Sequence, residues 1–342
     1  MACSRRFSPF AHSSGQRRPL ISAVRLLALS YRVRLPAFLT VAVSIVGALC
    51  PHEVAGQDSM PRLALSAEPA PLTEGSVRWL LVQLRSDSLL SGTAAGEPIH
   101  FEAAPDGHRG SYRGIVGVPL EMPESLMVTL VLTDGYGIDT VQGSIRVKPA
   151  NYPRETITVA PAFAKPNATA TARIERENAR SREVSVASRS RPRLWDGSFR
   201  LPRTARITSP FGAARVYNGE VKSRHTGTDF AGVVGAPVLA AGRGVVALVA
   251  DFYLAGRAVY IDHGSGLVTA YFHLSQTNIS EGDTVNAGQR IGAVGQSGRV
   301  TGPHLHWVAR YGTISVDPMS LLQLQKGVSD SVSKEAISTP SQ

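Results

Sequence analysis

The chain has 342 residues, of which 43% are hydrophobic and 18% charged, so its composition excludes a wholly disordered protein and suits about two packed domains. Its net charge is +10, but residues 1–56 hold seven of the 36 basic residues and one of the 26 acidic residues. The remainder has 29 basic and 25 acidic residues, a balance of +4. Because the basic excess belongs mostly to this N-terminal segment, we expect no nucleic-acid partner.

Residues 1–56 have the pattern of an export leader. An arginine-rich start precedes an uncharged apolar run of 16 residues from Leu35 to Cys50, fewer than the ~20 that a membrane-spanning helix needs. Val54-Ala55-Gly56 then places small residues where signal peptidase cuts. We therefore expect cleavage after Gly56 and export to the periplasm or cell envelope. The alternative is a retained leader that anchors the protein in the membrane.

The two cysteines, Cys3 and Cys50, both lie in this leader. The exported protein would therefore have no thiol, so it would contain no disulfide. Any metal would have to be held by nitrogen and oxygen ligands.

Residues 57–165 read as short strands separated by turns. The expected strands are Val77–Leu84, Ile99–Glu102, Ser111–Val116, Leu126–Leu132, Gly143–Val147 and Thr156–Val159. Strands at this spacing, without a helical period, predict a small β-sandwich of immunoglobulin-like type. No cluster of acids, histidines or thiols occurs there, which favours a spacer or docking module.

Residues 166–203 are predicted to be a basic linker with a short polar helix over Ala172–Arg180. Between Thr171 and Arg203 there are nine arginines and four acids. We interpret the segment as a solvated connector, and contact with an anionic wall polymer is the alternative.

Residues 204–324 are again rich in strand-forming residues, with many glycines at turns. Hairpins at this density predict a compact antiparallel sheet, so the fold class expected for the whole chain is all-β. Residues 325–342 are rich in Ser, Lys and Gln and are predicted to be a disordered tail.

Five of the nine histidines lie between Arg224 and Trp307, and four of them form a candidate metal centre with one aspartate. His225 and Asp229 are four residues apart, roughly 13 Å along a straight strand, so a bend at Gly227 is needed to bring them together. His304 and His306 alternate on a strand and would therefore point to one side. A catalytic zinc site needs three protein ligands and an open position. The spacing alone does not assign a role to each histidine.

Four motifs carry a resemblance to a known family: Ser209–Gly212, His225–Asp229, Tyr271–Leu274 and Thr301–Trp307. Their order and intervals are similar to those of the lysostaphin-type zinc metallopeptidases, over roughly Arg206 to Leu321. The resemblance implies a two-sheet β-structure with a narrow groove over a Zn²⁺ ion.

The same resemblance implies the roles of the site residues. His225, Asp229 and His306 would bind zinc, His304 would be the general base, and His273 would assist it and stabilise the tetrahedral intermediate. The implied substrate is the peptide part of bacterial peptidoglycan. Two stretches depart from the family pattern or vary within it, Leu254–Ala258 and Ala213–Arg224, and they leave substrate preference open. His263, outside the motifs, is interpreted as structural.

The sequence thus predicts a wall-cutting zinc endopeptidase that acts on the stem peptides of peptidoglycan. The alternative is a non-catalytic activator or scaffold for another wall hydrolase. A lipoyl-type carrier is excluded, because no lysine lies between Lys222 and Lys326. The bond that is cut, blockage of the groove by another segment and the oligomeric state stay open at this point.

Overall fold

The computed structural model describes residues 63–85, 89–122, 124–134, 137–156, 166–196, 199–217 and 220–324. They belong to a compact unit that spans Asp58–Gln342 and is separate from Met1–Gln57. The predicted leader and tail therefore lie outside the described residues. Among those residues, no helix has the length and apolar character needed to cross a membrane.

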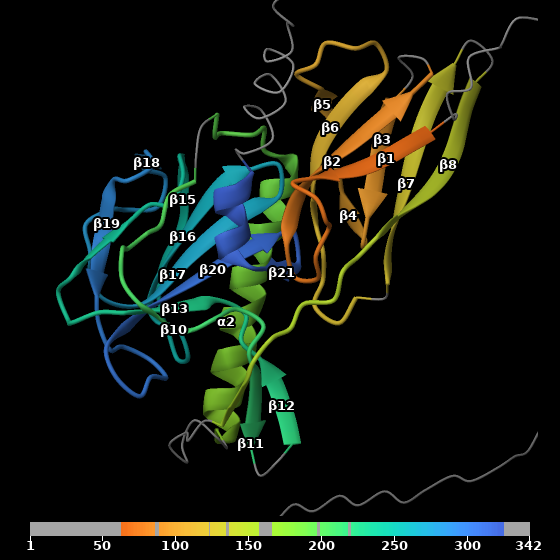
Figure 1. Ribbon diagram of the computed structural model, residues 1–342. Coiled ribbons are helices and arrows are strands. Elements are labelled where there is room, and N and C mark those ends of the chain that lie inside the picture. The colour runs from red at the N-terminus through yellow and green to blue at the C-terminus, as the bar shows by residue number, and fades with distance from the viewer. Residues whose placement is uncertain are drawn as a thin grey trace, which may run out of the picture. The chain divides into compact units, whose positions relative to one another are not determined.

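Two four-stranded antiparallel sheets form the N-terminal part (Figure 1). The first has the order β1-β2-β6-β5, with β1 Leu63–Glu68, β2 Val77–Leu84, β5 Glu102–Ala103 and β6 Ser111–Gly117. The second has the order β4-β3-β7-β8, with β3 Leu89–Ala94, β4 Glu97–Pro98, β7 Ser125–Asp134 and β8 Gly137–Arg146. Buried side chains from both sheets, including Leu80 and Leu130, share one core, so the two sheets form a β-sandwich.

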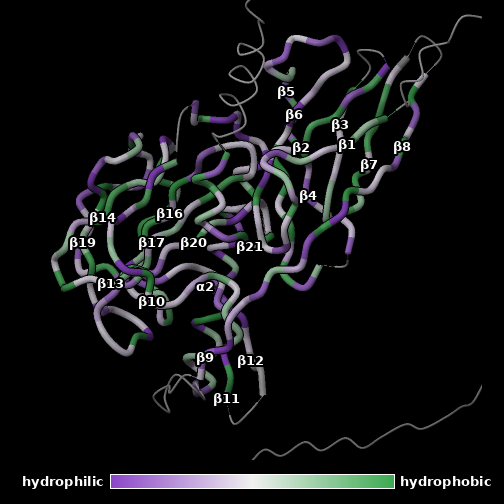
Figure 2. The backbone as a smooth tube through the Cα atoms, in the orientation of Figure 1, coloured by the Kyte–Doolittle hydropathy of each residue, from purple (hydrophilic) through white to green (hydrophobic). Residues whose placement is uncertain are grey.

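The C-terminal part is a ten-stranded sheet network with the main order β10-β13-β20-β17-β16-β15-β18. Its strands are β10 Ile207–Ser209, β13 Thr228–Ala231, β14 Pro237–Leu239, β15 Gly244–Phe252, β16 Gly256–Gly264, β17 Leu267–Thr277, β18 Thr284–Val285, β19 Arg290–Val294, β20 His304–Tyr311 and β21 Ile314–Val316. All of these pairings are antiparallel, which confirms the predicted all-β class. Hydrophobic stretches lie along β7, β16 and β17 (Figure 2).

A smaller three-stranded sheet joins the two parts of the chain. Strand β9 (Arg154–Thr156) pairs in parallel with β11 (Ala214–Tyr217), which pairs in turn with β12 (Glu220–Arg224). The strand thus begins two residues before the predicted start at Thr156, and 157–165 lie outside the described residues. Because β9 pairs with the C-terminal part, the sandwich strands end at Arg146, before the expected boundary at 165.

The segment predicted to be a short helix and solvated connector differs from that prediction. Helix α2 spans Ala168–Ala187, twice the expected length, and a short 3₁₀ turn η1 follows at Ser188–Ser190. The Asn167 side chain caps α2 by accepting a hydrogen bond from Ala170 N. The helix packs on β15, β16 and β17, with Val184 against the apolar cluster that includes Tyr260.

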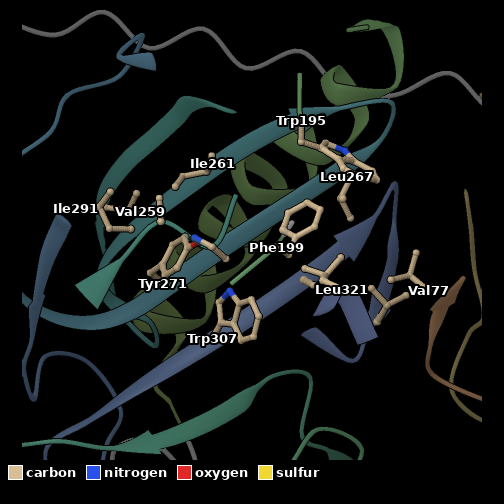
Figure 3. Close-up of a cluster of buried hydrophobic side chains, with 14 of the residues drawn as sticks. Val77, Trp195, Phe199, Val259, Ile261, Leu267, Tyr271, Ile291, Trp307 and Leu321 are labelled. Atoms are coloured by element: carbon tan, nitrogen blue, oxygen red, sulfur yellow. The ribbon is translucent and has the colours of Figure 1, made fainter. Parts of the chain in front are cut away.

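The predicted domains share one apolar core. Trp195 and Phe199, from the expected connector, are 6% and 4% exposed and point into the same cluster as Tyr271 and Trp307 (Figure 3). Val77 and Trp79 of the sandwich belong to this cluster too, as does Leu321 of the terminal 3₁₀ helix η2 (Pro318–Gln323). The interpretation of 166–203 as wholly solvated is therefore wrong, because its apolar residues complete the core of the C-terminal sheet.

Candidate metal centre and groove

The pairing of β13 with β20 places a carboxylate opposite an imidazole. Asp229 is the direct cross-strand partner of His306, and their side chains meet with 2.6 Å between Asp229 Oδ1 and His306 Nδ1. Leu305 and Trp307 alternate with the two histidines of β20 and are fully buried in the core on the other face. The period of two along this strand therefore sends the histidines to one side, as predicted from the sequence.

A turn at Gly227 brings His225 to the same point. His225 Nε2 lies 3.3 Å from Asp229 Oδ1 and 3.0 Å from His306 Nδ1. A Cβ atom at position 227 would come within 2.6 Å of the His306 ring and of the Trp307 carbonyl oxygen, so only glycine fits this bend. Hydrogen bonds of His225 N to Ala213 O and of Gly212 N to His225 O fix the backbone beside it.

Three basic atoms, His225 Nε2, Asp229 Oδ1 and His306 Nδ1, thus converge within 4.8 Å of one another. His225 Nδ1 lies 2.9 Å from Pro210 O, and since a carbonyl can only accept, Nδ1 carries the hydrogen and Nε2 presents its lone pair. Two imidazoles and one carboxylate with almost no solvent exposure are a donor set that suits zinc. The residues present therefore fit a zinc ion.

The electrostatics of this group favour a bound cation. Burial opposes charge on Asp229, but the adjacent His225 and His306 side chains outweigh it and hold the pKa of this carboxyl far below its usual range. Burial lowers the pKa of His306, against the opposing effect of Asp229. The carboxylate is therefore ionised at neutral pH, and a metal ion would balance its charge.

Two further imidazoles stand beside the three converging atoms. His304 Nδ1 donates to Gly302 O over 2.9 Å, and His273 Nδ1 donates to Ser297 O over 2.8 Å. In both rings this leaves Nε2 without a hydrogen and able to accept a proton. The two ring centroids are 4.9 Å apart, and His304 Nε2 is 3.7 Å from Asp229 Oδ1. All five residues singled out in the sequence therefore occupy one site.

His273 has a strained backbone, with φ at 62°, a region that non-glycine residues rarely adopt. Its N–H donates to Ala255 O over 2.9 Å, and the Ser297 carbonyl that holds its ring lies against Gly256. The stretch Leu254–Ala258, which departs from the family pattern, thus helps to orient this histidine. Burial, followed by the nearby His306 and His304, lowers the pKa of His273 to about 3, so its imidazole is neutral at neutral pH.

A second layer of polar groups supports His225 from outside the predicted set. Ser209 Oγ lies 3.0 Å from His225 Nδ1 and donates to Glu155 Oε2 over 2.7 Å. Because its own hydrogen goes to Glu155, the Ser209 oxygen accepts from His225. Glu155 comes from β9, which no feature of the local sequence marked as part of a site. Only the parallel pairing of β9 with β11 brings it there.

The five residues open into a groove of about 630 Å³. One wall comes from α2, through Ile174, Asn178 and Ser181, and another from the β11–β12 hairpin, through Arg215 and Ser223. Phe272 stacks on His306 with ring centroids 5.4 Å apart. The predicted groove is thus present, and α2 is a wall that the linker interpretation missed because the helix carries no strong apolar stripe. His263 lies apart, fully buried between Arg243 O and Thr269 Oγ1.

Comparison with known proteins finds similarity in the C-terminal part. Residues 223–318 match the model of peptidase family M23. The peptidoglycan DD-endopeptidase ShyA of Vibrio cholerae is 45% identical over 103 residues, 30% of this chain and 24% of ShyA. The DD-carboxypeptidase/endopeptidase Mpg of Neisseria meningitidis is 42% identical over 116 residues, 34% of this chain and 27% of Mpg. The chain thus spans about a quarter of the length of these relatives.

The resemblance in structure extends well beyond the segment that matches the family model. The crystal structure of a putative peptidase M23 from Pseudomonas aeruginosa superposes with a TM-score of 0.57 and 26% sequence identity. It covers 75% of this chain and 96% of that chain.

Proposed function

We propose that this chain, whose residues 223–318 form a peptidase family M23 domain, is a zinc endopeptidase that cuts peptide cross-links of peptidoglycan in the cell envelope. The observation that carries the proposal is the convergence of His225, Asp229 and His306 beside two proton-accepting imidazoles in one groove. The relatives named as peptidoglycan endopeptidases support the substrate class.

In this proposal His225 Nε2, Asp229 Oδ1 and His306 Nδ1 hold the metal. The zinc ion supplies Lewis acidity, which polarises a substrate carbonyl and lowers the pKa of water at the site. Other residues hold these three atoms in place. Pro210 O and Ser209 Oγ orient the His225 ring, and the pairing of β13 with β20 holds His306 against Asp229.

His304 is proposed as the general base. Its Nδ1–H is engaged by Gly302 O, so Nε2 receives the proton from the attacking water and later delivers it to the leaving amine. His273 is held in the same tautomer by Ser297 O. To donate a hydrogen bond to the oxyanion of the tetrahedral intermediate, His273 Nε2 must first take up a proton. Burial opposes this protonation in the resting site. The negative charge that develops on the oxyanion favours it.

The proposed location follows from the substrate and from the leader. Peptidoglycan lies outside the cytoplasmic membrane, and residues 1–56 carry the sequence pattern of an export signal. We propose a periplasmic or envelope location, with the leader either removed after Gly56 or retained as an anchor.

The test is to incubate residues 57–342 with purified peptidoglycan and to identify the released muropeptides by mass spectrometry. We expect release that stops with a zinc chelator and returns when zinc is added back. The masses then name the bond that is cut. If a chain with one zinc bound releases nothing, the endopeptidase proposal fails and the non-catalytic activator or scaffold takes its place.

A further inference from the structure

Arg215 lies in the groove, and one of its guanidinium nitrogens has no hydrogen-bond partner among the described residues. It lies on β11, is half-buried, and lines the same groove as His225, Asp229, His304 and His306. Its Nε atom is buried and has no hydrogen-bond partner among the described residues. Buried guanidinium nitrogens are normally paired.

Among the residues that the structure describes, two other arginines of the groove already have partners. Arg224 binds Glu121 and the Gly212 carbonyl oxygen, and Arg310 binds Ser181 Oγ. Glu155 is the cross-strand neighbour of Arg215 on β9, but its carboxylate accepts from Ser209 instead. Glu155 therefore supports the His225 ring through Ser209 and does not bind Arg215.

The place of Arg215 is unfavourable for metal binding alone. Arg215 lines the same groove as the proposed metal ligands, and its fixed positive charge repels a divalent cation. A favourable interaction of Arg215 must offset this repulsion, and an anionic group of the substrate would provide one.

We infer that Arg215 is a specificity residue that binds a free carboxylate of the substrate next to the bond that is cut. The planar fork of a guanidinium matches a carboxylate in two parallel hydrogen bonds. This inference rests on the proposed function and narrows its substrate.

The chemistry of the two candidate cross-links decides which carboxylate is meant. In a D,D cross-link, the carbon that bears the amine of the scissile amide also bears a free carboxylate. A terminal D-Ala-D-Ala has the same arrangement. A glycine bridge has a further peptide bond at that position and so offers no anion. Arg215 thus favours D,D bonds over glycine bridges, a choice that the sequence left open.

The test compares the wild-type protein with Arg215→Gln and Arg215→Lys on two cross-linked muropeptide dimers. One dimer has the free carboxylate on the cross-linked D-centre, and the other has a carboxamide there. We expect R215Q to lower kcat/KM on the free acid by about 10- to 100-fold, mainly through KM, as for loss of a charged hydrogen bond. R215K should recover part of this loss. On the carboxamide, R215Q and wild type should be alike.

Arg224→Gln is the matched control, because this groove arginine already has partners. It should leave the ratio of kcat/KM between the two dimers unchanged. Zinc content and thermal melting check that each variant folds.

A monomeric pentapeptide ending in D-Ala-D-Ala tells the cross-link carboxylate from the chain-terminal carboxylate. If R215Q also loses activity on this pentapeptide, Arg215 binds the chain-terminal carboxylate as well. If R215Q loses activity only on the dimer, Arg215 binds the carboxylate of the cross-link.

Equal losses on acid and carboxamide, or none on either, overturn the role of Arg215. Wild-type protein that cuts neither dimer instead contradicts the proposed function, so the two failures are distinguishable.

Discussion

At the scale of single residues, the proposed mechanism assigns metal binding and proton transfer to different residues of the site. His306→Ala removes an atom that lies 2.6 Å from Asp229 Oδ1 and should abolish both zinc binding and cleavage. His304→Ala removes a ring that is held by Gly302 outside the three converging atoms. It should keep zinc near one per chain and lower turnover by about 10²- to 10⁴-fold, as for loss of a general base.

Metal analysis by mass spectrometry and muropeptide release measure the two effects side by side. His108→Ala, an exposed histidine of the sandwich, should behave as wild type in both. Full zinc occupancy in H306A would refute its assignment as a ligand, and an unchanged rate in H304A would remove it from the mechanism.

The second layer around His225 gives a separate prediction. Ser209→Ala deletes the hydroxyl that bridges His225 Nδ1 and Glu155, leaving the ring less firmly oriented. Zinc affinity, measured by competition with a chromophoric chelator, should fall by roughly 10- to 100-fold, and Glu155→Gln should fall less. Ser223→Ala, an exposed serine of the same groove, is the control. If S209A binds zinc with wild-type affinity, the Ser209 hydroxyl does not contribute to metal binding.

The residues of the centre itself could be predicted because they occur in short motifs whose spacing limits where their side chains can point. His304 and His306 follow from the period of two, and the bend at Gly227 follows from the distance between His225 and Asp229. Glu155 and Arg215 could not be found this way. They reach the site through strand pairing between segments some 60 residues apart, which no local pattern encodes.

At the scale of elements, one buried carboxylate ties three segments together. Glu97 on β4 is 2% exposed and accepts both guanidinium hydrogen bonds of Arg189, on η1, at 2.7 Å. It also accepts from the N–H and hydroxyl of Thr313, between β20 and β21. Although burial opposes its charge, these bonds hold the pKa of Glu97 below its usual value.

The sign of the resulting pH dependence follows from that direction. The unfolded chain binds a proton at Glu97 at higher pH than the folded chain does, so stability falls as pH drops below about 4.5. Glu97→Gln should cost about 1–3 kcal/mol of unfolding free energy at pH 7 and flatten the loss of stability in acid. Urea unfolding between pH 7 and pH 3.5 measures both. If the variant loses unfolding free energy as steeply in acid as the wild type does, other carboxyl groups cause that loss.

Strand β2 was predicted over its full length, whereas for helix α2 only the middle part, Ala172–Arg180, was predicted. Val77–Leu84 and β2 coincide, because its alternating apolar residues pack in the sandwich core. Helix α2 instead contacts the sheet through buried serines, Ser181 and Ser185, and through a hydrogen bond from Arg310. A helix held by such polar contacts has too weak an apolar period to mark its ends.

At the scale of the whole molecule, the sandwich and the ten-stranded sheet are joined through a common core. Trp79 of β2 lies 5.9 Å from Trp195 between ring centroids, and its indole N–H donates to the carbonyl oxygen of Leu324 over 2.6 Å. The guanidinium of Arg113 covers the same indole at 4.4 Å. Ring contacts and a buried hydrogen bond thus join β2 to the connector and to the end of the C-terminal part, and a cation covers the ring at this junction.

A fragment that starts at Ile207 therefore lacks part of its own core. It loses Trp195, Phe199 and the sandwich residues that pack on them, which leaves apolar surface of the ten-stranded sheet open to water. We expect this fragment to melt well below residues 57–342 or to aggregate, as followed by circular dichroism. A fragment that starts at Ser188 regains the connector and should recover part of the loss. Equal melting temperatures for all three would show that the sheet is self-sufficient.

The shared core also predicts that both parts unfold together. Trp79→Ala lies in the common cluster, and Leu130→Ala lies in the core of the sandwich alone. Each should cost roughly 3–5 kcal/mol. If the parts are coupled, calorimetry of the chelated protein shows one transition, and L130A lowers it as W79A does. Independent parts would instead give two transitions, with L130A moving only one. Strand β9 and helix α2 both line the groove, and in the sequence they lie between the sandwich strands and the ten-stranded sheet. Coupled unfolding would therefore mean that the sandwich helps to hold the groove walls in place.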